Sequence, residues 1–363
     1  MPALALATSV AGEQEELHLG CEEGARFRIA SITKPMTASL AVRLLDLDAP
    51  TGIWPEDVRI RHLLAHVTGY GGEIGDLSRF GEGDDALGAA VAELPSVERL
   101  VPLEAAWSYA NTGYWLAGWL AAQANGSTYE EALREHVLEP AGLDGATFSA
   151  PSIDGTGAGA DGGDYPRARR PSGGLVASAA DVGRFAAWQL AQPWTSALRV
   201  PLAKPPGGVY GLGFFGERVA GVDVWGHPGS YGGFQSSLLV VPSHDAWFVG
   251  LTNSGLGSQA LRLIEDAWFE QLLGARRRVP PTAELTPEEL ARFRGRYVNE
   301  DLTVSVEPGG AGLLVQTDDL EATARPIGPT TFEIVGGDAD GARFDFPLDG
   351  FARFGSRLAQ RSA

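Results

Sequence analysis

The pattern of apolar and polar positions divides the chain into a helix-rich stretch framed by strands and a C-terminal stretch of short strands. Apolar residues at helical spacing predict helices at 31–47, 60–66, 89–94, 111–124, 128–139, 178–190 and 258–273. A period of two predicts an N-terminal hairpin and four later strands, at 4–10, 16–19, 209–215, 219–225, 235–241 and 247–252. Residues 150–173, rich in Gly, Asp, Pro and Arg, are too irregular for regular structure and predict a loop. We therefore predict an α+β fold, in which helices flank an antiparallel sheet built from both ends of this region.

Beyond residue 274 the pattern changes. A charged, proline-bounded stretch is typical of a linker, and a short helix should begin near Thr286. Short alternating segments then predict a small all-β domain of barrel type, with strands at 296–298, 302–306, 313–316, 322–326, 331–335, 343–347 and 351–354. We predict domains at 1–275 and 286–363, joined by a linker at 276–285. The β domain shows no internal repeat and no cluster of catalytic residue types.

The charge balance limits the possible partners. The 363 residues carry a formal net charge of −18, which argues against nucleic acid or an anionic membrane as the main partner. No apolar stretch is long enough for a transmembrane helix. The N-terminal apolar run has no basic residue before it, so we interpret it as a strand rather than a signal peptide and expect a cytoplasmic protein, with a trimmed secreted form left open. The single cysteine, Cys21, excludes an internal disulfide or a cysteine metal cluster, and we expect it to be passive.

One stretch combines a serine and a lysine on one helix face. Ser31 and Lys34 are three residues apart, and Pro35 places them in the first turn of a helix because proline is tolerated only there. Lys34 and Lys204 are the only lysines, while arginine carries the other positive charge. Lysine can lose its proton when buried and arginine cannot, so a site that needs a neutral amine must keep lysine. Taken alone, the pair is also compatible with a helix cap beside a surface lysine.

Two further stretches supply candidate partners for this pair. Tyr109 and Asn111 lie in a connection between helices, whereas His227, Gly229 and Ser230 lie beside a strand. Each has an ordinary structural interpretation: a core tyrosine, a helix cap, and a histidine in a turn. Their order along the chain favours a shared site. The histidines show no metal-ligand spacing, so we expect no metal and no other cofactor.

These motifs resemble those of the serine β-lactamase and penicillin-binding-protein superfamily, especially its class C-like branch. That branch contains D-alanyl-D-alanine carboxypeptidases, D-aminopeptidases and amidases, and esterases of the same fold. The resemblance covers about residues 3–275 and rests on Phe27-Arg-Ile-Ala-Ser-Ile-Thr-Lys-Pro, Trp107-Ser-Tyr-Ala-Asn-Thr-Gly-Tyr and Gly226-His-Pro-Gly-Ser-Tyr-Gly-Gly-Phe, with supporting phrases at 60–69 and 171–178. The C-terminal domain resembles a lipocalin-like appendage. The usual Pro-Gly before the tyrosine motif is replaced at 103–106, which we expect to alter one wall of the cleft.

The residues and the resemblance together imply an acyl-enzyme mechanism. Ser31 is the expected nucleophile and Lys34 its base, with a pKa lowered by burial and by the helix N-terminus. The resemblance implies that Tyr109 moves the proton to the leaving group and helps to activate the deacylating water, and that Asn111 holds the substrate amide. It also implies an oxyanion hole of two backbone N–H groups, from Ser31 and Ser230.

The strand stretch has two further expected roles. His227 replaces a lysine or tryptophan of other members, and it should orient Tyr109 or a substrate carboxylate. Gly229 lets the strand approach the substrate closely.

The His-x-Gly motif favours amide over ester substrates, because esterases of this fold often carry tryptophan in place of the histidine. We therefore expect a serine hydrolase that cleaves amide or peptide bonds, in D-amino-acid-containing peptides or β-lactam-like amides. Three alternatives stay open: a carboxylesterase, an acyltransferase or peptide cyclase with an amine acceptor, and a penicillin-binding receptor that does not turn over. The expected partner is a small-molecule or peptide substrate, and the oligomeric state is left open.

Overall fold

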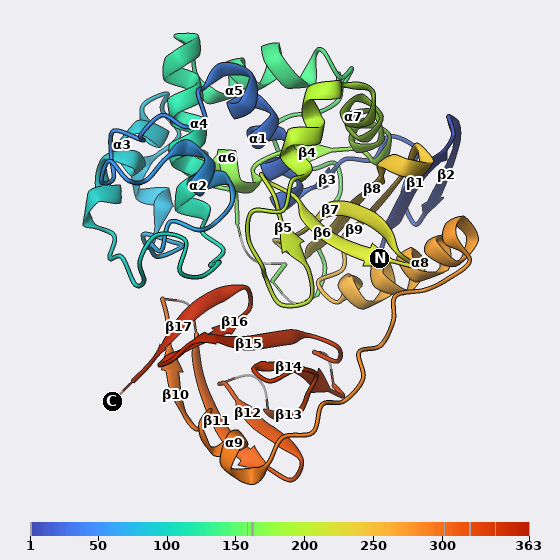
Figure 1. Cartoon of the computed structure of the whole chain (residues 1–363). Helices are drawn as coiled ribbons and strands as arrows, with labels where there is room; N and C mark the ends of the chain where they lie inside the picture. Colours follow the sequence, from blue (N-terminus) through green and yellow to red (C-terminus); the bar gives the residue numbers. More distant parts are fainter. Residues whose placement is uncertain are drawn as a thin grey trace.

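The computed structural model describes residues 2–157, 159–160, 163–300, 302–318, 321–337 and 339–362. Residues 158, 161 and 162, within the loop predicted at 150–173, lie outside this part. Figure 1 shows a larger α+β part and, below it, a β-barrel that follows a long connecting segment. Among the described residues, no helix is both long and apolar enough to cross a membrane.

The larger part contains a seven-stranded antiparallel sheet built from both ends of its sequence, as predicted. Its strands, from one edge to the other, are β2 (Glu13–Leu19), β1 (Leu4–Val10), β9 (Ala246–Thr252), β8 (Phe234–Val241), β7 (Val222–Tyr231), β6 (Phe215–Val219) and β5 (Val209–Tyr210). The N-terminal hairpin thus pairs with a strand almost 250 residues later, in the register Leu4 to Thr252. A separate two-stranded sheet joins β3 (Phe27–Arg28) to β4 (Val176–Ala177).

Helices cover both faces of the large sheet, and the alternation of strand side chains explains why. Leu238 and Val240 of β8 join the main core, whereas Leu239 and Val241 join a second core with α8. The main core also takes in most of the remaining helices (Figure 1). The helices are α1 (Thr33–Leu44), α2 (Ile60–Leu64), α3 (Ala86–Glu93), α4 (Asn111–Asn125), α5 (Tyr129–Leu133), α6 (Arg170–Gly173), α7 (Ala179–Ala191), α8 (Gly257–Leu273) and α9 (Pro287–Ala291).

Three local predictions were wrong. The strand predicted at 209–215 is interrupted and yields only β5 and the start of β6. Strand β7 continues to Tyr231, so the His-x-Gly motif lies within a strand rather than beside one. The predicted loop at 150–173 ends in a 3₁₀ turn and the short helix α6, because Pro171 is well placed in a first helical turn.

The C-terminal barrel is closed and has eight strands. They are β10 (Gly295–Val298), β11 (Thr303–Gly309), β12 (Gly312–Gln316), β13 (Glu321–Pro326), β14 (Thr331–Val335), β15 (Arg343–Leu348), β16 (Phe351–Phe354) and β17 (Arg357–Arg361). The sequence reading missed β17, which pairs with β10 and closes the barrel. Aromatic side chains fill the interior; the rings of Phe293 and Phe346 stack at 4.4 Å between centroids.

The barrel docks onto the larger part through its β16–β17 hairpin. Leu358 packs against Val101 and Ala106, and Ala106 belongs to the segment 103–106 whose sequence departs from the resembled family. The backbone N–H of Tyr109 donates to the carbonyl of Ser356 at 2.9 Å. The barrel therefore supports the backbone of a predicted catalytic residue.

A buried ion pair holds this hairpin in place. Arg353 is 3% exposed, and its guanidinium binds Asp345 within the barrel. It also donates to the carbonyls of Trp107, at 2.8 Å, and Lys204, at 3.2 Å, in the larger part. Four acceptor contacts satisfy this buried cation, so its loss should leave Asp345 uncompensated.

We predict that Arg353→Leu lowers the free energy of unfolding by about 3–5 kcal/mol, because the substitution strands a buried carboxylate. Equilibrium urea denaturation followed by circular dichroism measures the change. The matched control is Arg294→Leu, since Arg294 pairs with Glu307 on the barrel surface with both side chains more than half exposed. The control should change stability by about 0–1 kcal/mol. Equal losses for the two variants would contradict the proposed role of the buried pair.

Candidate active site

Ser31 lies at a sharp bend between strand β3 and helix α1. A 3₁₀ turn, Ala30–Ile32, leads directly into α1, and Pro35 falls in the first turn of that helix as predicted. Ala30 has a φ of +45°, a left-handed conformation that costs a non-glycine residue about 1–2 kcal/mol. This strained residue immediately before Ser31 turns the chain abruptly and leaves the serine side chain half-buried at the bend.

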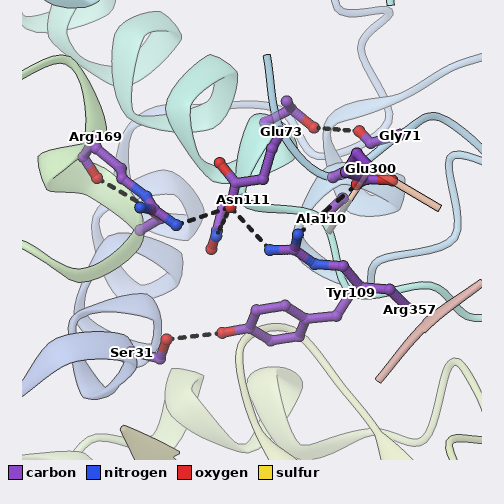
Figure 2. A network of polar contacts seen from close by, with 12 residues as sticks. Ser31, Gly71, Glu73, Tyr109, Ala110, Asn111, Arg169, Glu300 and Arg357 are labelled. Carbon is purple, nitrogen blue, oxygen red and sulfur yellow. Dashed lines mark hydrogen bonds and ion pairs between the residues drawn. The ribbon is translucent and has the colours of Figure 1, made fainter. Parts of the chain in front are cut away.

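The structure brings three of the predicted residues into contact around one oxygen atom. The Oγ of Ser31 lies 3.2 Å from the Nζ of Lys34. The same oxygen accepts a hydrogen bond from the Oη of Tyr109 at 2.9 Å (Figure 2). The Nζ of Lys34 also donates to the carbonyl oxygen of Ser172, in α6, at 2.6 Å. The site therefore joins distant parts of the chain. Tyr109 is 78 positions from Ser31, and Ser172 is 138 positions from Lys34.

Burial lowers the pKa of Lys34 well below that of a free lysine. The side chain is fully buried, and the guanidinium groups of Arg169 and Arg357 lower the pKa further, while the carboxylate of Glu73 opposes them. The ring of Tyr109, 4.7 Å from the Nζ, also favours the charged form. Burial is the largest of these effects, and it favours the neutral amine, whose lone pair could take the Ser31 proton.

Tyr109 keeps its proton. Burial raises its pKa above the usual value, and the hydrogen bond to Ser31 offsets this only in part. The phenol is therefore a proton donor toward Ser31, and Lys34 is the stronger base of the two. A phenolate at this position would need a protonated lysine, which the burial of Lys34 disfavours.

His66, which was not predicted as a site residue, packs against the ring of Tyr109. The ring of His66 lies 4.4 Å from the Tyr109 ring, and its Nδ1 accepts the backbone N–H of Ala110 at 3.0 Å. The proton of the neutral imidazole is therefore on Nε2, which is buried and has no partner within the described part of the chain. His66 fixes the backbone between Tyr109 and Asn111.

His227 is neutral and both of its ring nitrogens are occupied. Its Nδ1 lies 2.6 Å from the carbonyl of Pro228, so Nδ1 carries the proton, and its Nε2 accepts from the hydroxyl of Tyr210 at 3.2 Å. Burial lowers the pKa of His227 to about 3. The ring lies 6.0 Å from that of Tyr109, close enough to pack beside it, and it offers no positive charge to a substrate carboxylate.

Gly229 is required by the close approach of β7 to the serine. A Cβ atom at this position would lie 2.4 Å from the carbonyl oxygen of Ile29 and 3.1 Å from the backbone nitrogen of Ser31. The strand therefore runs directly past the N–H group expected in the oxyanion hole. Ser230 follows at the exposed edge of the cleft, and the role of its N–H group stays a prediction.

Asn111 is the first residue of α4 and has one unused acceptor. Its Nδ2 donates to the carboxylate of Glu73, whereas its Oδ1 is buried without a partner among the described residues. A buried acceptor of this kind is normally satisfied, so the Oδ1 is suited to an N–H group of a bound substrate. This placement fits the predicted role in holding the substrate amide.

Glu73 joins Asn111 to two arginines that the sequence reading also missed. Arg169, just before α6, and Arg357, at the start of β17, each donate to Oε1 of Glu73 at 2.8 Å (Figure 2). Glu300 of the barrel lies 3.7 Å from Arg357. Glu73 and Glu300 also line a cavity of about 720 Å³ between the larger part and the barrel. No sequence spacing links these residues, because the docking of the barrel brings them together.

Comparison with known proteins places these features in a wider group. Residues 1–273 match the family described as Beta-lactamase. Penicillin-binding protein 4 of Amycolatopsis lactamdurans is 27% identical over 364 aligned positions, which cover 83% of this chain and 94% of that protein. A crystal structure of SurE with D-Leu superposes with a TM-score of 0.77 and 24% identity over 99% of this chain and 95% of that one. A D-stereospecific amidohydrolase from Streptomyces sp. superposes with a TM-score of 0.62 and 20% identity, over 75% and 94% of the two chains.

We predict that a fluorophosphonate probe phosphonylates Ser31, with loss of fluoride, at a rate that rises with pH and levels off well below the ordinary lysine pKa of about 10.4, because the rate follows the neutral fraction of Lys34. Lys34→Arg should slow the reaction about 10²- to 10⁴-fold and abolish the pH dependence, since arginine stays charged. Stopped-flow or quenched mass spectrometry measures the rate. Lys204→Arg is the matched control, because Lys204 is exposed and contributes only its backbone carbonyl to a contact described above. An unchanged rate in folded Lys34→Arg would exclude the neutral-base role.

Proposed function

Because this chain belongs to the Beta-lactamase family of serine hydrolases, we propose that it cleaves amide bonds through an acyl-enzyme on Ser31, with D-amino-acid-containing peptides and related amides as substrates. One observation carries this proposal. The Lys34 amine and the Tyr109 phenol both contact the Ser31 hydroxyl, and burial shifts the pKa of each in the direction that favours its neutral form. Serine is a weak nucleophile at its ordinary pKa and needs a base within hydrogen-bond reach.

In acylation, the Nζ of Lys34 takes the Ser31 proton as Oγ attacks the substrate carbonyl carbon. The carbonyl oxygen becomes an oxyanion, which the backbone N–H groups of Ser31 and Ser230 stabilise. The C–N bond then breaks. Tyr109 gives its proton to the leaving nitrogen and recovers one from the Lys34 ammonium, so the amine departs neutral and Lys34 is ready for the next step.

In deacylation, the same groups act on water. Lys34, assisted by Tyr109, removes a proton from the water as its oxygen attacks the ester carbonyl. The Ser31–acyl bond breaks, Ser31 regains a proton, and the product leaves as a carboxylic acid. An amine in the place of water would give a new amide by the same sequence.

Protonation of Tyr109 favours amides over esters. An amine is a poor leaving group unless its nitrogen is protonated, whereas an alkoxide or phenolate needs less assistance. The phenol lies 2.9 Å from Ser31 Oγ, next to the position where the leaving nitrogen must form. The unused Oδ1 of Asn111 supplies an acceptor for a substrate amide N–H on the same side of the cleft.

The relatives support the proposed substrate class. The Streptomyces enzyme is named as a D-stereospecific amidohydrolase, and SurE has been crystallised with D-Leu. The Amycolatopsis relative is named as a penicillin-binding protein. These names agree with amide substrates and with ligands of D configuration. The predicted catalytic domain, 1–275, contains all the residues that take part in the bond-making steps.

The test combines a covalent probe with a substrate panel. We expect a fluorophosphonate or penicillin adduct on Ser31 by mass spectrometry, and turnover of D-amino-acyl nitroanilides at a kcat/KM at least about tenfold above that of the L-isomers. Ser31→Ala should abolish both. Faster turnover of short-chain nitrophenyl esters with no amidase activity would establish the carboxylesterase alternative, and a new amide formed with added amines would establish the acyltransferase. A stable adduct without any turnover would establish the penicillin-binding receptor that does not turn over.

A further inference from the structure

The two arginines at Glu73 point to a binding site that the reaction described above does not use. We propose that Arg169 and Arg357 form a carboxylate-binding subsite beside Ser31, and that Glu73 is its resident occupant, displaced when a substrate carboxylate binds. The proposal rests on the proposed function for the location of the reacting bond, but the binding of a carboxylate can be measured without any reaction.

The geometry is that of a receptor for one carboxylate oxygen. The guanidinium of Arg169 approaches Oε1 of Glu73 from α6, and that of Arg357 approaches it from the barrel, each at 2.8 Å. The Nδ2 of Asn111 is the third donor to the same oxygen. Charge-assisted bonds from guanidinium to carboxylate are among the strongest polar contacts in proteins. Any carboxylate that replaced Glu73 would meet the same three donors.

The charges around the cleft favour an anion at this position. Burial lowers the pKa of both Lys34 and His227, whereas Arg169 and Arg357 are the two labelled cations of the network in Figure 2. Glu300, 3.7 Å from Arg357, offsets part of their charge. A substrate ammonium bound to Glu73 would lie between two guanidinium groups and would be repelled by both. The arrangement therefore selects against an amine and in favour of a carboxylate.

Glu73 has room to leave. It belongs to a segment, 71–76, without helix or strand, and Gly75 within that segment has a φ of +79° and open space around it. The side chain lines the 720 Å³ cavity, whose other walls include Ser96, Gln360 and Ser362, the carboxylates of Glu93, Glu98 and Glu300, and Arg361. Rotation of Glu73 into this polar cavity would vacate the two guanidiniums. The three other carboxylates would oppose the rotation and Arg361 would favour it, so the bound substrate carboxylate must supply the remaining free energy.

The subsite defines a substrate class and gives the barrel a function. Suitable substrates carry a carboxylate separate from the scissile carbonyl, either in the acyl part or in the leaving amine. Because Arg357 comes from β17, the site is complete only when the barrel is docked. Arg357 then determines substrate specificity, and the barrel has a role in substrate binding as well as in structure.

Binding to the Ser31→Ala variant tests the proposal without chemistry. Isothermal titration calorimetry would use two matched pairs, each an anionic ligand and its neutral analogue. Succinyl-D-phenylalanine nitroanilide and its methyl ester place the charge in the acyl part. Acetyl-D-alanyl-D-alanine and its C-terminal amide place it in the leaving part. We expect the anionic member of at least one pair to bind about 10- to 100-fold more tightly, as for a hydrogen-bonded charge pair.

Three variants decide the cause of that preference. Arg357→Gln should abolish it while leaving the neutral ligand unaffected, whereas Arg294→Gln, a barrel-surface control, should change nothing. Glu73→Ala should tighten binding of the anion several-fold, because the internal competitor is gone. If Arg357→Gln does not fold, Arg169→Gln makes the same prediction from the larger part.

Three results would overturn the proposal. The first is no preference for either anion, and the second is a preference that persists in folded Arg357→Gln. The third is weaker anion binding in Glu73→Ala, which would make Glu73 an anchor for a ligand cation. Failure of the proposed function can be distinguished from failure of the subsite. A missing Ser31 adduct together with intact carboxylate binding would refute the reaction and keep the subsite.

Discussion

The burial of one amine determines much of this structure. An ammonium ion cannot be moved out of water without a large cost, so a lysine with no exposed surface must either be paired or give up its proton. Among the residues that the structure describes, no carboxylate contacts Lys34; its Nζ lies against Ser31 and a backbone carbonyl. The surrounding helices create this environment, and Arg169 and Arg357 reinforce it from outside. The sharp turn at Ala30 then places Ser31 within reach of the amine.

The C-terminal barrel belongs to the same arrangement. Its last hairpin binds the backbone of Tyr109 through Ser356 and contributes Arg357 to the cluster above the serine. The buried Arg353 ties the hairpin to Trp107. Phenylalanine rings fill much of the barrel interior. The barrel therefore contacts the predicted active site through the β16–β17 hairpin on its outside and not through its interior.

The sequence predicted the parts that depend on local chemistry. Ser31, Lys34 and Pro35 form one helical turn, and residue type with spacing was enough to place them. The large sheet followed from alternating segments. The end of β7 and the whole of β17 were missed for one reason. Each lies beside a two-residue hairpin turn in which both residues have positive φ: Gly232-Gly233 joins β7 to β8, and Gly355-Ser356 joins β16 to β17. Reading these turns would have extended β7 past His227 and revealed β17 with Arg357. Glu73 and Arg169 carried no such signal, because only tertiary packing brings them together.

The central claim is that Lys34 is a neutral amine in the folded protein, and its pKa can be measured directly. The chain has only two lysines, so protein labelled with ¹³C at lysine Cε gives two signals by NMR, and Lys204→Arg assigns them. The account predicts that the Lys34 signal titrates well below the ordinary value of about 10.4, while that of the exposed Lys204 titrates near it. A Lys34 signal that titrates at or above the ordinary value would contradict the account.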